Sequence, residues 1–318
     1  MRILLWHVHG SWATAFLQGR HDYVLPVLPD RGPDGLGRAR TWDWPASVVE
    51  LPPERLAEPR PDVVVLQRPH EAALLEQWTG LRAGVDVPAV YVEHNTPEGD
   101  VTGMRHHLAG QTRVPVVHVT EFNRMMWDNG SVPTRVVEHG VLDPGPIWTG
   151  EVPRLSMSVN EPVRRWRVAG MDLAAAVAGS VPVDVYGMGT DALVDREPAF
   201  ASGLHENLTQ AGLHLRMASH RAYLHTYRWT SLGLSLLEAM VLGSPVLVLA
   251  ATAAPEAVPA GAGLVSSDVR ALAGAARDLL ADPAAAAQAG KLAREHVLAH
   301  FSLERFLADW DALLAEVV

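Results

Sequence analysis

Short apolar runs, each long enough for one strand, recur along the first half of the chain and are separated by stretches that suit helices. Several of these runs are solidly apolar instead of alternating, which is typical of strands buried on both faces of a parallel sheet. Helices are predicted between them at His70–Leu81 and Glu121–Asp128. The predicted strands are Arg2–Val8, Val24–Leu28, Val63–Leu66, Ala89–Val92, Val114–Val119 and Arg135–Val137. This alternation predicts an α/β doubly wound domain.

A second α/β domain is predicted after a linker rich in proline and glycine at residues 143–153. The apolar runs resume there at Leu155–Val159, Val181–Tyr186, Leu213–Met217 and Pro245–Leu249. A length of 318 residues, 48% of them hydrophobic, suits two domains with a core each. We therefore expect domains at residues 1–148 and 149–302, followed by a helix over 303–318 with an apolar stripe that includes Phe306 and Trp310.

The composition narrows the range of partners and cofactors. The net charge is −10 and both halves are acidic, so a nucleic acid partner is not expected, while a membrane surface is left open. There is no cysteine, the histidines show no metal-ligand spacing, and Asp309 and Asp311 point to different faces of a predicted helix, so no metal is expected. The N-terminal apolar run lacks the length and cleavage site of a signal peptide, which predicts a cytoplasmic protein.

The segment Thr230–Pro245 reads as a loop that enters a helix, a glycine stop at Gly243, and a buried strand. Ser231 and Gly233 are small, so a ligand can approach their backbone closely. The unpaired N–H groups and the dipole at the start of a helix favour a phosphate or diphosphate. Glu238 falls one to two turns into the helix, where its carboxylate can accept hydrogen bonds from hydroxyl groups. The alternative is an ordinary amphipathic helix with a glycine C-cap.

This segment resembles the Glu-x7-Glu signature of the retaining GT-B glycosyltransferases of family four, in an actinobacterial-like form; positions 233, 234, 237–240, 243, 245 and 246 match it. The resemblance implies two Rossmann-like domains that face each other across a cleft. It also implies that Glu238 binds the ribose of a nucleotide sugar. The backbone of Ser231, Leu232, Gly233, Leu234 and Ser235 would then meet the sugar and the diphosphate. Thr230 replaces the first glutamate of the signature, which leaves the donor sugar open.

Further segments in the second domain extend the resemblance. Residues 158–170 occupy the place of the family's Gly-Arg…Lys-Gly loop, which implies that Arg165 grips the diphosphate, with Asn160, Arg164 and Arg167 beside it. Guanidinium groups bind phosphate bidentately, and Lys291 is the only lysine in the chain. The alternative is a set of solvated arginines. Gly187 and Gly189 resemble the family's strand that ends in Gly-x-Gly. Residues 137–143 and 255–265 also match in order and spacing.

In the first domain, His94 follows an apolar strand, where α/β domains place ligands, and it resembles the family's histidine that faces the donor sugar. Gly10 and Ser11 resemble the glycine-containing loop near the acceptor and the diphosphate. Trp42 and Trp44 border the irregular loop at residues 29–45 and are candidates for stacking on an acceptor sugar, or they anchor the loop on the core. His94 could equally be satisfied by local backbone. We interpret His7, His106, His107 and His139 as structural or surface residues.

The resemblance implies an enzyme that transfers a sugar, of hexosyl type, from a nucleotide-diphosphate sugar to an acceptor with retention at the anomeric carbon. His94, Arg165 and Glu238 would be its catalytic residues. No cofactor is implied, because the leaving phosphate oxygen takes the acceptor proton and no metal or carboxylate base is needed. The acceptor is a small molecule, a glycan or a lipid-linked compound. The alternatives are a sugar-nucleotide epimerase of the same fold, a phosphorylase, for which Lys291 is badly placed, and a catalytically inactive nucleotide-sugar-binding protein.

Overall fold

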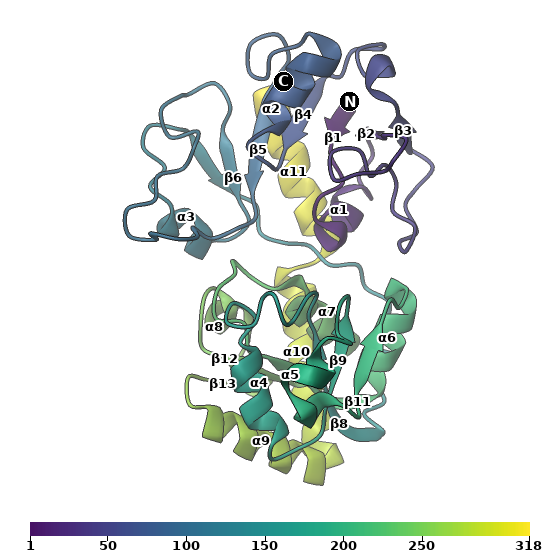
Figure 1. Cartoon of the computed structure of the whole chain (residues 1–318), viewed down its shortest axis with the longest axis vertical. Coiled ribbons are helices and arrows are strands. Elements are labelled where there is room, and N and C mark those ends of the chain that lie inside the picture. Colours follow the sequence, from purple (N-terminus) through teal and green to yellow (C-terminus); the bar gives the residue numbers. More distant parts are fainter. The chain divides into compact units, whose positions relative to one another are not determined.

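The computed structural model describes residues 1–318 and divides the chain into two compact units (Figure 1). The first unit comprises Met1–Gly140 and Leu303–Val318, and the second comprises Val141–Ser302. The chain thus leaves the first unit after Gly140, where the sequence analysis placed the boundary after residue 148. No helix is both long enough and apolar enough to cross a membrane.

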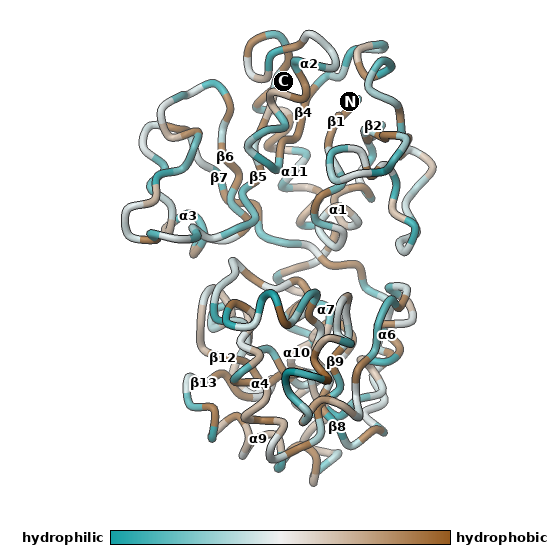
Figure 2. The backbone as a smooth tube through the Cα atoms, viewed as in Figure 1, coloured by the Kyte–Doolittle hydropathy of each residue, from teal (hydrophilic) through white to brown (hydrophobic).

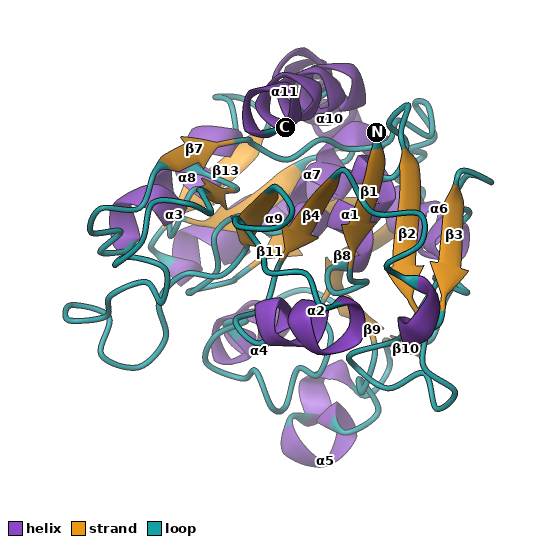
Figure 3. Ribbon diagram, turned by 90° about the horizontal axis from the view of Figure 1, so that it is seen from above, coloured by secondary structure: helices purple, strands orange, loops and turns teal.

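The first unit contains a parallel seven-stranded sheet in the order β3-β2-β1-β4-β5-β6-β7. Figure 3 shows β1, β2 and β3 of this sheet side by side. The strands are β1 (Arg2–Leu5), β2 (Asp22–Pro26), β3 (Val48–Leu51), β4 (Val63–Leu66), β5 (Ala89–Glu93), β6 (Val116–His118) and β7 (Thr134–Val136). All four residues of β4 are buried hydrophobic residues, and Figure 2 shows such runs along the strands. The sequence prediction of buried parallel strands is confirmed, although it did not include β3.

Helices cover both faces of this sheet. They are α1 (Gly10–Phe16), η1 (Pro53–Arg55), α2 (Glu71–Thr79), α3 (Glu121–Met126) and α11 (Leu303–Val317). Leu75 of α2 belongs to the core on one face, which contains Leu4, Val64 and Tyr91. α1 and α11 share an aromatic cluster, in which Trp12 stacks on Phe16 at 4.9 Å and Trp310 lies 4.9 Å from Phe16 and 5.7 Å from Trp12. The apolar stripe of the C-terminal helix therefore packs on the first unit.

The second unit contains a parallel six-stranded sheet in the order β10-β9-β8-β11-β12-β13. Its strands are β8 (Val152–Ser158), β9 (Val183–Gly187), β10 (Leu204–Glu206), β11 (His220–His225), β12 (Val246–Leu249) and β13 (Gly263–Ser266). Its helices are α4 (Met171–Ala178), α5 (Leu193–Arg196), η2 (Pro198–Phe200), α6 (Gln210–Ser219), α7 (Leu234–Leu242), α8 (Ala254–Ala257), α9 (Val269–Ala281) and α10 (Pro283–His300). Both sheets follow the doubly wound order in which ligands bind where the winding reverses, beside β1 and β4 in the first unit and beside β8 and β11 in the second.

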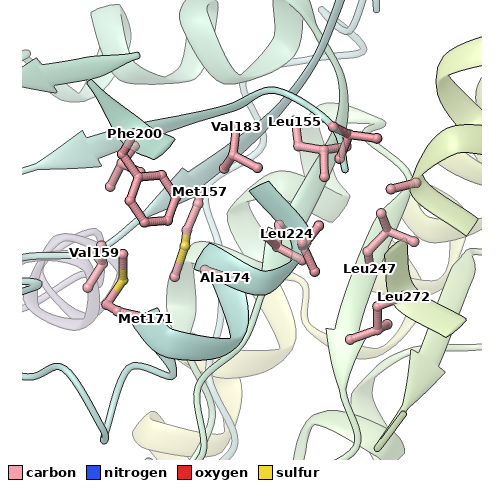
Figure 4. Packing of buried hydrophobic residues seen from close by; sticks show 14 of the residues in the cluster. Leu155, Met157, Val159, Met171, Ala174, Val183, Phe200, Leu224, Leu247 and Leu272 are labelled. Carbon is pink, nitrogen blue, oxygen red and sulfur yellow. The ribbon is translucent and has the colours of Figure 1, made fainter. Parts of the chain in front are cut away.

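The core of the second unit lies between the sheet and helices α4 and α9 (Figure 4). Met157 of β8, Leu224 of β11 and Met171 of α4 are fully buried within it. Alternate residues of β11 point to opposite faces, so Leu224 faces this core while Tyr223 points toward α7, where its hydroxyl bonds Ser235. The strand β11 therefore connects the core to the start of α7.

The prediction of a strand at Leu213–Met217 is wrong, because these residues belong to helix α6. Thr209 caps this helix by accepting a hydrogen bond from the N–H of Gly212, and Leu215 is 64% exposed, as expected on the outer face of a surface helix. The strand follows at His220–His225, and all six of its residues are buried. This strand was not predicted because it contains polar residues. Each of these residues has a specific partner: His220 bonds Asp184 at 2.8 Å, and Arg221 donates to the carbonyl oxygen of Gly150 at 2.6 Å.

Candidate functional site

The loop and helix at Thr230–Pro245 have the predicted conformation. Helix α7 begins at Leu234 with Gly233 as its N-cap, and it ends at Gly243 in the left-handed conformation before β12. No side chain caps its N-terminus, because glycine has none to offer. The preceding Ser231 and Leu232 are buried at 1% and 6% exposure. The first N–H groups of this nine-residue helix therefore have no side-chain acceptor, and they lie next to the loop that contains Ser231 and Leu232.

Glycine is needed at position 233 because of the atoms around it and not because of its backbone angles. Its φ of −71° and ψ of 116° are open to any residue. A Cβ atom at this position would lie 2.5 Å from Cε1 and 3.0 Å from Nε2 of His225, which is closer than carbon atoms approach. The His225 ring, 1% exposed, thus lies directly against the N-cap of α7.

Glu238 lies in the second turn of α7 and is 8% exposed. Its Oε2 is 3.9 Å from Nε2 of His214 on α6, and that nitrogen is also 2.6 Å from Nε2 of Gln210. The carboxylate has no arginine or lysine partner, so its lone pairs are available to hydroxyl donors. The sequence analysis did not identify His214, which became visible only when α6 was recognised as a helix.

The three predicted diphosphate arginines differ in their pairing. Arg164 forms an ion pair with Glu161, and Arg167 forms one with Asp172 at 2.6 Å. Arg165 forms no ion pair with a carboxylate; its guanidinium carbon lies 5.4 Å from the ring centre of Tyr227. Burial raises the pKa of the Tyr227 hydroxyl, while the Arg165 charge and a hydrogen bond from Arg165 to that hydroxyl act in the opposite direction. Of the three, Arg165 therefore carries a positive charge that no acidic side chain offsets.

Asn160, Gly187 and Gly189 form a turn beside Arg165. Oδ1 of Asn160 accepts a hydrogen bond from the N–H of Met188 at 3.0 Å, so this side chain organises the turn between the two glycines. Gly187 has a φ of 149°, and a Cβ there would lie 2.1 Å from the carbonyl oxygen of Val159. Only glycine allows the end of β9 to pack this closely on the end of β8.

His94 follows β5 in the first unit and is 9% exposed. Gln67 donates from Nε2 to the carbonyl oxygen of Trp6 at 2.7 Å, so its Oε1, 3.1 Å from Nε2 of His94, is the acceptor for that imidazole N–H. Nδ1 of His94 then carries a lone pair. Burial lowers the pKa of His94 well below its ordinary value, and His9 and His139 lower it further. His94 is therefore a neutral imidazole with a fixed tautomer.

Two further histidines bear on His94: His9, which precedes the predicted Gly10-Ser11 loop, and His139. The ring of His9 lies 4.0 Å from that of His94, and His139 is 3% exposed. Burial lowers the pKa of His139 to about 3. His139 was interpreted as structural or surface, yet it contributes to the same neutral cluster. The position of Gln67 directly after the apolar run Val63–Leu66 was the one signal in the sequence that pointed to a polar group at this strand end.

Gly10 and Ser11 open helix α1 with His9 as the N-cap, and Trp42 covers Gly10, whose Cβ would meet the indole Nε1 at 3.2 Å. Trp44 is 3% exposed, and its indole N–H donates to Oγ1 of Thr14 at 2.8 Å. The prediction that Trp44 stacks on an acceptor is wrong, because this ring anchors the loop in the core. Trp42 is only partly buried and stays a candidate.

The predicted site residues thus gather at the carboxyl ends of the strands in each unit. His94, Gly10 and Ser11 follow strands of the first sheet, while Asn160, Arg165, Gly187 and the start of α7 follow strands of the second. The Asp309-Trp310-Asp311 sequence takes no part, because Asp309 pairs with Arg305 and Asp311 with His21, and Trp310 is 1% exposed. No group of three or more histidine, aspartate or glutamate side chains in the chain has an arrangement that could hold a metal ion.

Comparison with known proteins agrees with this geometry. Residues 173–282, which lie within the second unit and include α7, match the family model for Glycosyl transferases group 1. No curated protein matches the sequence. A mutant of S. aureus TarM, in complex with Fondaparinux, alpha-GlcNAc-glycerol and UDP, is 16% identical with a TM-score of 0.62, over 79% of this chain and 55% of that one. The chain therefore spans about half the length of TarM.

Other solved structures match along the whole chain. Anabaena HepE in complex with UDP-glucose is 16% identical with a TM-score of 0.70, over 99% of this chain and 100% of that one. Sucrose-phosphate synthase from Thermosynechococcus elongatus is 14% identical with a TM-score of 0.68, over 99% and 98%. At sequence identities of 14–16%, the likeness to these structures establishes the fold alone. The chain has the GT-B fold, with two doubly wound parallel sheets, and residues 173–282 match the group 1 glycosyl transferases.

Proposed function

We propose that this protein is a glycosyltransferase that moves a sugar from a nucleotide-diphosphate sugar to an acceptor, with retention at the anomeric carbon and without a metal. The GT-B fold and the match of residues 173–282 to the group 1 glycosyl transferases support the enzyme class. HepE has been solved with UDP-glucose, which makes a UDP-sugar the first donor to test here.

The observation that carries the proposal is that the second unit contains two positive elements without acidic partners. Arg165 has no carboxylate partner, and α7 begins with a glycine N-cap and no side-chain cap. Breaking the bond between the anomeric carbon and the β-phosphate oxygen leaves a new negative charge on the diphosphate. A guanidinium and unpaired helix N–H groups stabilise that charge more as it grows, and this lowers the barrier.

Glu238 provides the nucleoside part of the site. Its buried carboxylate has no cationic arginine or lysine beside it and accepts hydrogen bonds from the ribose hydroxyls. A hydrogen bond from a hydroxyl to a charged acceptor contributes more binding free energy than one between neutral groups. This contact therefore increases the affinity for the nucleotide and does not change the rate of reaction at the anomeric carbon.

The first unit offers His94 and Trp42 to the transferred sugar and the acceptor. The neutral His94, whose Nε2–H is fixed by Gln67, accepts a hydrogen bond at Nδ1 from a sugar hydroxyl. The acceptor is a small molecule, a glycan or a lipid-linked compound, whose hydroxyl oxygen attacks the anomeric carbon. Its proton passes to the leaving phosphate oxygen on the same face, so no carboxylate base takes part in this step.

Calorimetry with UDP, GDP, ADP and dTDP, with the corresponding diphosphate sugars, tests the proposal. We expect one nucleoside diphosphate to bind, Arg165→Ala to weaken it by at least about tenfold, and Arg164→Ala, whose partner is Glu161, to change it little. Equal losses for both variants would contradict the role of Arg165. Binding that is undisturbed by EDTA supports metal independence.

The products distinguish the reaction from its alternatives. Slow hydrolysis of the bound nucleotide sugar, with release of the sugar in the anomeric configuration of the donor, supports retention when followed by NMR. Conversion of the donor to another nucleotide sugar without an acceptor would assign an epimerase. Tight binding without turnover across donors and acceptors would assign an inactive nucleotide-sugar-binding protein, an outcome that the replacement at Thr230 makes worth testing.

A further inference from the structure

Three neighbouring rings on and after strand β11 form a row, which we term the β11 ring stack: Tyr223, His225 and Tyr227. The Tyr223 and His225 rings are 6.2 Å apart at 31°, and the His225 and Tyr227 rings are 4.9 Å apart at 24°. All three residues are at most 8% exposed. The β11 ring stack lies at the reversal of winding in the second sheet, where β11 adjoins β8.

One end of the β11 ring stack holds the start of α7. The hydroxyl of Tyr223 donates to Oγ of Ser235 in the first turn at 2.9 Å and accepts from the N–H of Ser158 at 3.4 Å. The next ring, His225, presents the edge that carries both nitrogens to Gly233: Nε2 and Nδ1 lie 3.0 and 3.6 Å from the position of a Cβ there. The position of the helix N-terminus is thus fixed by contact with two rings.

The other end holds Arg165. Tyr227 lies under the guanidinium, whose carbon is 5.4 Å from the ring centre, and the tyrosine hydroxyl is 3.5 Å from the carbonyl oxygen of Ser158. A guanidinium over a buried aromatic face is oriented by the ring while its charge stays available. An aspartate or glutamate in the same place would orient the arginine equally well but would neutralise it toward an anionic ligand.

His225 is an unusual choice for the middle of such a stack. Its Nδ1 is buried and has no hydrogen-bond partner. Burial lowers the pKa of the ring to about 3, so it is neutral and does not repel Arg165 on the far side of Tyr227. An aliphatic side chain would fill this space without leaving a buried polar atom unpaired. The planar ring that packs face to face with Tyr227 and edge-on to Gly233 is what an aliphatic residue cannot supply.

We propose that Tyr223, His225 and Tyr227 are positioning residues that fix Arg165 and the first turn of α7 in one geometry, so that both act on the same diphosphate. The inference rests on the proposed function, since it takes the diphosphate of a nucleotide sugar as the ligand. It adds that the two anion-binding elements act as a unit coupled through strand β11.

Calorimetry with UDP, and displacement measurements with uridine, test the coupling. Tyr227→Leu removes the aromatic face and is expected to weaken UDP about tenfold while leaving uridine unchanged, because uridine carries no phosphate. Tyr227→Phe keeps the face and loses only the hydroxyl that accepts a hydrogen bond from Arg165, so it is expected to bind UDP more tightly than Tyr227→Leu does. The double variant Tyr227→Leu, Arg165→Ala is expected to bind UDP no more weakly than Arg165→Ala alone, since the ring acts through the arginine.

Tyr186→Leu is the matched control. Tyr186 is also a buried tyrosine of the second sheet, and it stacks on His205 at 4.6 Å instead of on an arginine. It is expected to lower the melting temperature as Tyr227→Leu does and to leave UDP affinity unchanged. If Tyr227→Leu fails to fold, His225→Leu, which interrupts the stack in its middle, is expected to show the same selective loss of UDP.

The outcomes separate the two proposals. If Arg165→Ala loses UDP while Tyr227→Leu and His225→Leu bind it as the wild type does, the β11 ring stack has no positioning role and the proposed function stands. If both ring variants lose UDP and uridine equally, the effect is structural and the inference is overturned. If the wild type binds no nucleoside diphosphate of any base, the proposed function and the inference both fall.

Discussion

The contact between Gly233 and His225 allows a sharp test of how the anion site is built. In Gly233→Ala the new Cβ lies 2.5 Å from Cε1 of His225, whereas carbon atoms approach to about 3.5 Å at closest. The ring or the loop must therefore move by about 1 Å. The backbone angles of Gly233 suit alanine, so the clash with the ring is the main cost.

We expect this overpacking to lower the free energy of unfolding of the second unit by about 1–3 kcal/mol. The loss of a glycine N-cap adds several tenths of a kcal/mol, because alanine is a poorer N-cap than glycine. Movement of the loop also displaces the first N–H groups of α7, so UDP affinity is expected to fall by about tenfold.

The reasoning is tested in a double-mutant cycle with His225→Ala. Removing the ring leaves room for the Cβ, so Gly233→Ala in that background is expected to cost only the N-cap contribution, which gives a coupling of about 1–3 kcal/mol. Hydrogen exchange of the α7 and β11 amides measures the stability of this unit separately, which matters because a chain of two units need not unfold in two states.

Gly274→Ala is the matched control for the glycine substitution. Gly274 lies inside helix α9, and its Cβ would find its nearest atom, Nη2 of Arg277, at 3.9 Å. It is expected to stabilise the unit by about 0.5–1 kcal/mol. If Gly233→Ala costs the same with and without the His225 ring, the ring does not exclude the Cβ and the explanation given for this glycine is refuted.

Three further predictions concern other parts of the chain. Glu238→Gln is expected to weaken uridine and UDP alike by calorimetry, and a loss confined to the intact nucleotide sugar would contradict a ribose role. Trp42→Ala is expected to raise the KM for the acceptor with little effect on the melting temperature. Trp44→Ala removes a buried side chain from the core and is expected to lower the melting temperature. The reverse pattern would contradict the assignment of the two residues. Burial lowers the pKa of His118 to about 4 and that of His139 to about 3, from 6.5 in the unfolded chain. The contribution of these neutral histidines to the free energy of unfolding is therefore complete above pH 6.5 and is lost as the pH falls toward the folded-state values. At pH 5 each is expected to cost about 2 kcal/mol in urea unfolding, and a His139→Gln variant that is equally acid-sensitive would contradict this.

The fold was largely predictable because most of its strands are uninterrupted apolar runs in the sequence. Val63–Leu66 was predicted with the bounds that the structure has, since a parallel strand buried on both faces tolerates only apolar residues. β11 was missed for the opposite reason. Its His220 and Arg221 are buried by partners on other segments, and a single sequence does not reveal which distant groups will satisfy a polar side chain.

The site was predictable in its position but not in its internal distinctions. A loop that enters a helix predicts an anion site from local chemistry alone, and the structure has Gly233 at the N-cap and Glu238 in the second turn of α7, as expected. Arg165 was chosen by resemblance alone. The physical difference among the three arginines required the structure, because it lies in the acids that the fold brings beside Arg164 and Arg167. The neutral tautomer of His94 likewise depends on Gln67, which is 27 residues away in sequence.

Helix α11 makes the order of synthesis differ from the order of folding. The first unit comprises Met1–Gly140 together with Leu303–Val318, and Trp310 packs against both Trp12 and Phe16. When a ribosome has made the first unit's sheet, the aromatic surface of α1 has no cover, and it must wait while all of the second unit is translated. The second unit is contiguous and can fold first. The unit that is made first is therefore completed last, and its Trp12–Phe16 surface stays exposed until α11 has been made.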